Sequence, residues 1–239
     1  MTETILTYRN DPAFKAAFLA ELDKHAALDA FTKGTYGMMN GHFRGCGIGC
    51  SLASLNVLRG APVLEQTGQH ERYPSELGWP LWLAYLEDNL FESLPDGLSK
   101  TWPARLSAAV PVGVEIPDRV LAKILRWSLA NATYGVRHVT DNPEAIAVID
   151  RMIALFDRSI ADDEPSDTEW SEAARDARDA RVAWVAWVAW DAWAARAARD
   201  ARVAWVAWAA RAASDAWAAR AGFYPALSDY VISELQALG

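Results

Sequence analysis

One short segment of the chain holds most of the residues whose types could do chemistry. Gly34–Cys50, with the sequence GTYGMMNGHFRGCGIGC, contains six glycines, both cysteines, one of the four histidines and an arginine. The apolar run Ser51–Leu58 follows and is closed by Gly60, which predicts a helix that begins where the glycines end. Glycines are expected to cluster where the backbone needs a positive φ or a close approach. Free N–H groups and the positive end of the helix dipole make such a helix start a site for anions.

We therefore expect a small anionic, nucleotide-like ligand at this segment, with Arg44 supplying charge and Tyr36 a stacking face. The predicted ligand-binding residues are Tyr36, His42, Arg44, Gly45, Cys46, Gly47, Gly49 and Cys50. The alternative is a structural loop whose glycines let two helices approach closely. The segment matches neither the P-loop nor the dinucleotide-binding pattern.

A second interpretation is nucleophilic catalysis by a cysteine. A thiol at a helix N-terminus is expected to have a lowered pKa, which favours the reactive thiolate. Cys50, or Cys46, would then attack, with His70 or His42 as the base. The carboxylates that could orient this base are Glu71 and Glu76. The alternative is that both cysteines are buried as small apolar side chains.

The same residue types raise the question of a metal. His42, Cys46, Cys50 and His70 have side chains that bind zinc, but the two histidines lack the paired spacing of structural zinc sites. We therefore expect no metal and no cofactor.

Carboxylates also gather in a predicted helix over Trp79–Leu94 and just before it. Glu76, Glu87 and Asp88 could serve acid–base chemistry as a pair, although ordinary acids on a helix surface are the simpler interpretation.

Composition excludes several classes of function. The chain has 239 residues, 52% of them hydrophobic, which is enough to bury a sizeable core. Its net charge of −8 argues against binding nucleic acid, which calls for a basic face. Residues 1–10 lack the pattern of a signal peptide, and no apolar run reaches the ~20 residues that cross a bilayer. We expect a cytoplasmic protein without a membrane partner.

Helix signals follow one another along the chain, and no stretch alternates long enough to indicate a sheet. Asp11 and Pro12 predict a helix start, and this helix is expected to end at Gly34 and to bury Leu28. Further helices are predicted over Trp79–Leu94, Pro103–Val110, Asp118–Tyr134, Pro143–Ile160 and Phe223–Leu238. We expect an all-α fold, with a helical globular domain over residues 1–161 and a second part over residues 162–239.

A repeat dominates this second part. A capping box at Ser166 and Glu169 opens a stretch without glycine or proline that lasts to Ala221. The eleven residues ARDARVAWVAW occur at 177–187 and again at 198–208, an offset of three heptads. As one helix, the stretch would be about 80 Å long, and the heptad spacing favours a supercoil between copies. The predicted contacts of a homo-oligomer are Trp184, Trp187, Trp190, Trp205 and Trp208.

Several short motifs resemble one family. KGTYG at Lys33–Gly37, GCGIGC at Gly45–Cys50, HERY at His70–Tyr73, ELGWP at Glu76–Pro80 and LEDNLFESLP at Leu86–Pro95 resemble an uncharacterised family of phage and bacterial proteins. Members often end in helical repeats rich in Ala, Trp and Arg. The resemblance implies no established activity and no catalytic residues, and relatives are expected to carry a histidine near Ala53. It implies an accessory protein of a phage or mobile element, which could capture a host defence signal.

Three functions follow as hypotheses. The first is a binding protein, not an enzyme, for a nucleotide-like anion. The second is an enzyme that uses Cys50. The third is a scaffold that acts through its tryptophan-rich helix.

Overall fold

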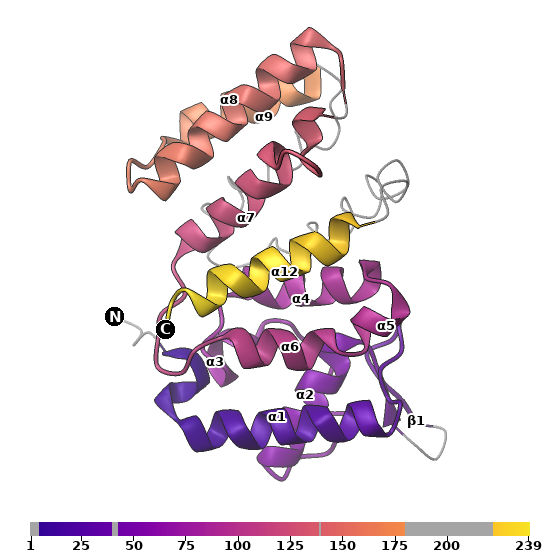
Figure 1. Ribbon diagram of the computed structural model, residues 1–239. Helices are drawn as coiled ribbons and strands as arrows, with labels where there is room; N and C mark the ends of the chain where they lie inside the picture. Colours follow the sequence, from indigo (N-terminus) through magenta and orange to yellow (C-terminus); the bar gives the residue numbers. More distant parts are fainter. Residues whose placement is uncertain (1–4, 40–42, 139, 180–221) are drawn as a thin grey trace. The chain divides into compact units, whose positions relative to one another are not determined.

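A computed structural model describes residues 5–39, 43–138, 140–179 and 222–239, and these residues confirm the predicted all-α fold (Figure 1). The helices are α1 (Pro12–Ala27), α2 (Gly47–Leu58), α3 (Arg72–Glu76), α4 (Leu81–Ser93), α5 (Asp96–Ser99), α6 (Trp102–Ala109), α7 (Asp118–Ala130), α8 (Pro143–Ile160), α9 (Asp167–Asp179) and α12 (Phe223–Gln236). Short 3-10 turns lie at η1 (Thr7–Asn10) and η2 (Val136–His138). The strands of the described part are β1 (Met38–Met39) and β2 (Phe43–Arg44), which pair antiparallel.

The chain divides into two compact units, residues 1–116 with 224–239 and residues 117–223. The boundary predicted between residues 161 and 162 falls inside the second unit, where α8 and α9 pack together. The ring of Phe156 in α8 lies 5.1 Å from that of Trp170 in α9, which is buried. Arg158 in α8 forms an ion pair with Glu169 in α9 at 2.5 Å. The acidic residues 162–164 and Pro165 therefore connect two packed helices.

Helix α2 lies at the centre of the first unit. It packs against α1, α4 and α6, and every residue from Gly47 to Asn56 is buried. Helix α12 lies beside α6, where Arg105 forms an ion pair with Asp229 at 2.8 Å (Figure 1). The predicted helix after the glycines is thus a core helix, and its start lies close to the neighbouring helix α4.

The predicted caps are confirmed, whereas the predicted end of the first helix is wrong. The carboxylate of Asp11 accepts hydrogen bonds from the amides of Ala13 and Phe14 at 2.8 and 3.2 Å. Asn142 caps α8 in the same way, and Ser166 and Glu169 form the reciprocal capping box. Helix α1 ends at Ala27 because the chain turns through a positive φ of 51° two residues later, which leaves Leu28 74% exposed.

In the second unit, α7 and α8 pack against each other, and so do α8 and α9. The tryptophans predicted to join copies of the chain (Trp184, Trp187, Trp190, Trp205 and Trp208) lie outside the described residues. Within the described ranges, every helix is too short or too polar to span a membrane.

Candidate functional site

The glycine-rich segment does lead into a helix, but its glycines serve packing. Helix α2 begins at Gly47 with Cys46 as its N-cap, ahead of the helix start predicted at Cys50. A Cβ atom on Gly49 would lie 2.2 Å from the carbonyl oxygen of Tyr36, and one on Gly47 would lie 3.3 Å from the Cβ of Phe91. Since real Cβ atoms do not approach so closely to a backbone carbonyl, Gly49 is required for contact with the segment before α2. This is the structural alternative that the sequence left open.

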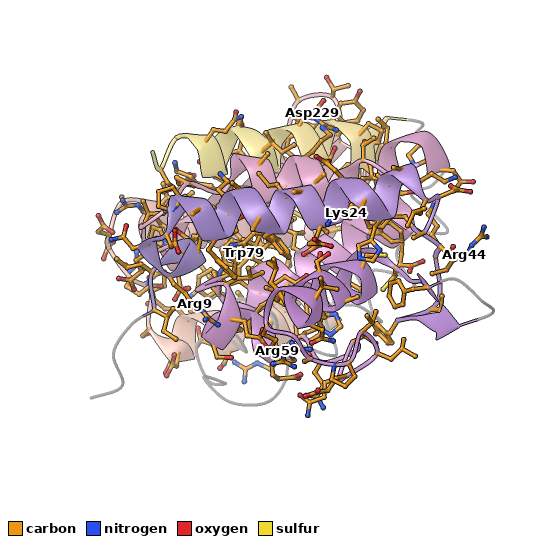
Figure 2. All side chains as sticks on the ribbon, turned by 90° about the horizontal axis from the view of Figure 1, so that it is seen from below. Arg9, Lys24, Arg44, Arg59, Trp79 and Asp229 are labelled. Atoms are coloured by element: carbon orange, nitrogen blue, oxygen red, sulfur yellow. The ribbon has the colours of Figure 1, made fainter. Side chains whose placement is uncertain are left out.

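Two backbone amides just before α2 and one in its first turn have partners inside the protein. The amide of Gly45 donates to the carbonyl of Ala30 at 2.9 Å, and that of Cys46 donates to the carbonyl of Thr35. The amide of Gly49 donates to Sγ of Cys46 at 3.5 Å. Arg44 is exposed, and its side chain points outward (Figure 2). His42 lies outside the described residues. This geometry adds no support to the predicted anion site.

Cys50 is not an activated nucleophile. Its side chain is fully buried, and its thiol donates to the carbonyl oxygen of Gly45 at 3.4 Å. Burial raises the pKa of the Cys50 thiol well above its usual value. The lowered pKa expected from the helix start is therefore wrong, because desolvation outweighs the helix dipole.

Cys46, by contrast, faces two carboxylates. Its sulfur and one oxygen each of Asp88 and Glu92 lie within 4.8 Å of one another. We call these three residues the Cys46 cluster. Cys46 is 1% exposed, and burial, together with the negative charges of Asp88 and Glu92, raises the pKa of its thiol. The sulfur of Cys46 accepts a hydrogen bond from the amide of Gly49.

Both carboxylates of the cluster lie on helix α4. Asp88 and Glu92 are four residues apart, so they lie on one face of the helix, and this face meets the start of α2. The Asp88 side chain is 13% exposed. Glu92 is partly exposed and accepts a hydrogen bond from the amide of Gly34 at 2.8 Å, which ties the glycine-rich segment to α4.

His70 joins this site through Asp88. Its Nε2 atom lies 3.1 Å from Oδ2 of Asp88. The ring of His70 stacks on that of Tyr85 at 4.2 Å, and Tyr36 meets it edge-on at 5.9 Å. The structure thus brings together Tyr36, Cys46 and His70 of the predicted residues, and adds Asp88 and Glu92.

The carboxylate that orients His70 is Asp88 and not either of the predicted ones. Glu76 is paired with Arg72 at 2.6 Å. Glu71 is exposed and accepts a hydrogen bond from the hydroxyl of Tyr85 at 3.4 Å.

Glu87, the neighbour of Asp88 in the sequence, faces the core instead. Its carboxyl group is fully buried and accepts hydrogen bonds from Ser51 at 3.0 Å and Tyr73 at 2.8 Å. Burial raises the pKa of Glu87 to about 8. The consecutive acids Glu87 and Asp88 therefore have separate environments, and they do not form an acid–base pair.

Comparison with known proteins adds no assignment: the chain matches no protein-family model, no curated protein and no solved structure.

Proposed function

We propose that the protein binds a divalent metal ion of the zinc type through Cys46, Asp88 and Glu92. The observation that carries the proposal is the convergence of a thiol and two carboxylates within 4.8 Å, from the start of α2 and one face of α4. The sequence does not predict this metal site. The histidines lack the paired spacing of structural zinc sites, and the three ligands of the Cys46 cluster come from two helices that are far apart in the sequence.

The charges of the Cys46 cluster favour a cation. Burial raises the pKa of the Cys46 thiol, and the two neighbouring carboxylates, which also repel each other, raise it further. A divalent ion reverses this balance, since a coordinated thiol loses its proton and the carboxylates gain a positive partner.

The donor set also selects the class of ion. A thiolate prefers zinc and other soft or borderline ions, whereas Mg²⁺ and Ca²⁺ prefer oxygen ligands alone. Zinc accepts sulfur at about 2.3 Å and carboxylate oxygen at about 2.0–2.2 Å in a tetrahedron, so the donor atoms need to draw together only modestly. Three protein ligands leave a fourth position for water, while His70 is hydrogen-bonded to the ligand Asp88.

The test is Zn²⁺ titration of the full-length protein by isothermal calorimetry, with the two cysteines as matched variants. Cys46→Ser is expected to weaken zinc binding at least 100-fold, because it replaces the thiolate ligand. Cys50→Ser is expected to bind zinc like the wild type, since the Cys50 thiol faces backbone carbonyls. Equal zinc affinity in both variants, or no binding by the folded wild type, would contradict the proposal.

The predicted anionic ligand stays a prediction. A thiolate and two carboxylates around a divalent ion leave one net negative charge, which favours a neutral donor at the fourth position over an anion. The setting in a phage or mobile element, the cytoplasmic location and the oligomer of tryptophan-rich helices are likewise predictions that the described residues do not test.

A further inference from the structure

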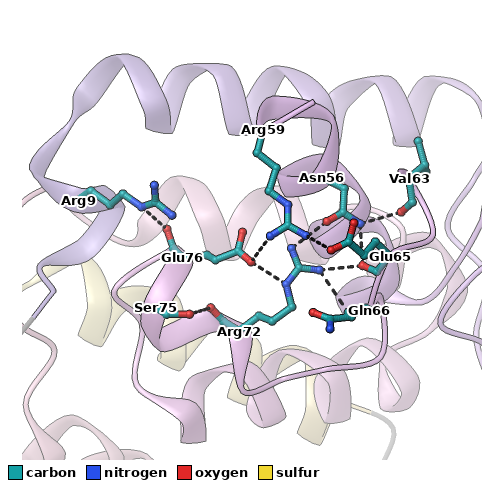
Figure 3. Close-up of polar contacts among 9 residues, drawn as sticks. All are labelled: Arg9, Asn56, Arg59, Val63, Glu65, Gln66, Arg72, Ser75 and Glu76. Carbon is teal, nitrogen blue, oxygen red and sulfur yellow. Dashed lines mark hydrogen bonds and ion pairs between the residues drawn. The ribbon is translucent and has the colours of Figure 1, made fainter. Parts of the chain in front are cut away.

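A buried arginine lies two residues after His70. Arg72, in α3, is 6% exposed, and each nitrogen of its guanidinium group donates a hydrogen bond (Figure 3). Nε donates to Glu76 at 2.6 Å, and Nη2 donates to the side-chain oxygen of Asn56 at 2.8 Å. Nη1 donates to the backbone carbonyl of Glu65 at 2.9 Å. Arg72 therefore joins α3 to the last turns of α2 and to the segment between them.

Asn56, in α2, also binds the segment between α2 and α3. Its side-chain amide donates to the carbonyls of Val63 and Glu65 at 2.9 and 2.8 Å (Figure 3). Arg59 adds ion pairs to Glu65 and Glu76 at 3.2 Å, but it is 38% exposed, so these pairs contribute little. The buried pair of Asn56 and Arg72 thus ties the segment over residues 59–71 to α2.

This arrangement connects the segment that ends at His70 to the helix that carries Cys46. Helix α2 carries Cys46 at its start and Asn56 near its end, while His70 lies at the end of the segment that Asn56 and Arg72 hold. We infer that Arg72 is a positioning residue, which holds His70 against Asp88 and thereby strengthens metal binding by the Cys46 cluster. The inference rests on the proposed metal site. Hydrogen-bond partners of metal ligands commonly change metal affinity by 10- to 100-fold.

A double-mutant cycle separates this function from a merely structural one. Zinc affinity is measured by competition with a chromophoric chelator for the full-length wild type, Arg72→Met, His70→Ala and the double variant. Each single variant is expected to bind zinc at least tenfold more weakly than the wild type. The double variant is expected to bind zinc no more weakly than His70→Ala alone, because Arg72 acts through His70. If the loss of zinc affinity in the double variant equals the product of the two single losses, the inference is overturned.

Control variants keep the test decisive. Arg59→Met removes the neighbouring exposed guanidinium and is expected to leave zinc affinity within twofold of the wild type. Should Arg72→Met fail to fold by circular dichroism, Asn56→Ala and Arg72→Lys replace it in the cycle, since lysine lacks the planar fork that reaches three partners. Wild-type protein that binds no zinc would refute the proposed function. Wild-type binding with independent losses in the cycle would refute only the positioning by Arg72.

Discussion

His70 and Asp88 meet through a hydrogen bond of 3.1 Å between Nε2 and Oδ2, although they are 18 residues apart and lie on different elements. An oxygen of the same carboxyl group lies within 4.8 Å of the Cys46 sulfur. Asp88 is therefore the residue through which the segment before α3, helix α4 and the start of α2 meet.

Zinc affinity should rise with pH. Because the pKa of the Cys46 thiol is raised, the ion must displace a proton from sulfur in order to bind. Release of one proton predicts about a tenfold lower Kd for each unit of pH between 6 and 8. Calorimetry in buffers of different ionisation enthalpy measures both the Kd and the number of protons released. A Kd that is constant over this pH range would show that no thiol proton is displaced.

Both cysteines should resist alkylation in the native, metal-free protein. Each is at most 1% exposed, and burial raises both thiol pKa values. Iodoacetamide at pH 7 is expected to label neither cysteine in the native protein and both in denaturant, as mass spectrometry of the digested chain would reveal. Rapid native labelling of Cys50 would instead favour the hypothesis of a cysteine-dependent enzyme.

Gly49→Ala should destabilise the first unit. The new methyl group would lie 2.2 Å from the Tyr36 carbonyl oxygen, so the backbone would have to move. The expected loss is about 1–3 kcal/mol of unfolding free energy, the range for overpacked cores, measured by urea denaturation. Gly97→Ala is the matched control, because nothing lies within 4 Å of its added Cβ. A Gly49→Ala variant as stable as the Gly97→Ala control would contradict the close packing.

Glu87 should make the protein less stable as pH rises. With a pKa of about 8 in the folded state against 4.5, the native protein holds a proton that the unfolded chain releases. The contribution of Glu87 to the free energy of unfolding is therefore largest below pH 4.5. It falls as the pH rises from 4.5 to 8 and is constant above pH 8. The slope is up to about 1.4 kcal/mol per pH unit.

The Glu87→Gln variant provides the comparison, because the amide keeps the shape of the side chain without the titration. Relative to the wild type, this variant should gain stability steadily between pH 5 and 8 in urea melts. A difference between the two proteins that does not change with pH would mean that Glu87 is ionised in the fold.

Local signals in the sequence predicted local features well. Asp11 and Ser166 are predictable as caps because a cap depends only on a side chain and the amides two or three residues on. The end of α1 was missed, because a non-glycine residue, Asp29, adopts the positive φ that turns the chain. The exposure of Leu28 follows from this turn.

Long-range packing decided the site and could not be predicted. Asp88 and Glu92 carry a recognisable spacing on one face of α4, but their meeting with Cys46 depends on how α2 and α4 pack. The raised pKa of Cys50 has the same origin, because the depth of the helix start in the core was not visible in the sequence.

The most direct test of the metal site is anomalous diffraction from crystals of the full-length protein grown with Zn²⁺, with data recorded on both sides of the zinc absorption edge. The account predicts one strong anomalous peak bonded to Sγ of Cys46 and to carboxylate oxygens of Asp88 and Glu92. Crystals with no peak there, or with zinc only at surface residues elsewhere, would contradict it.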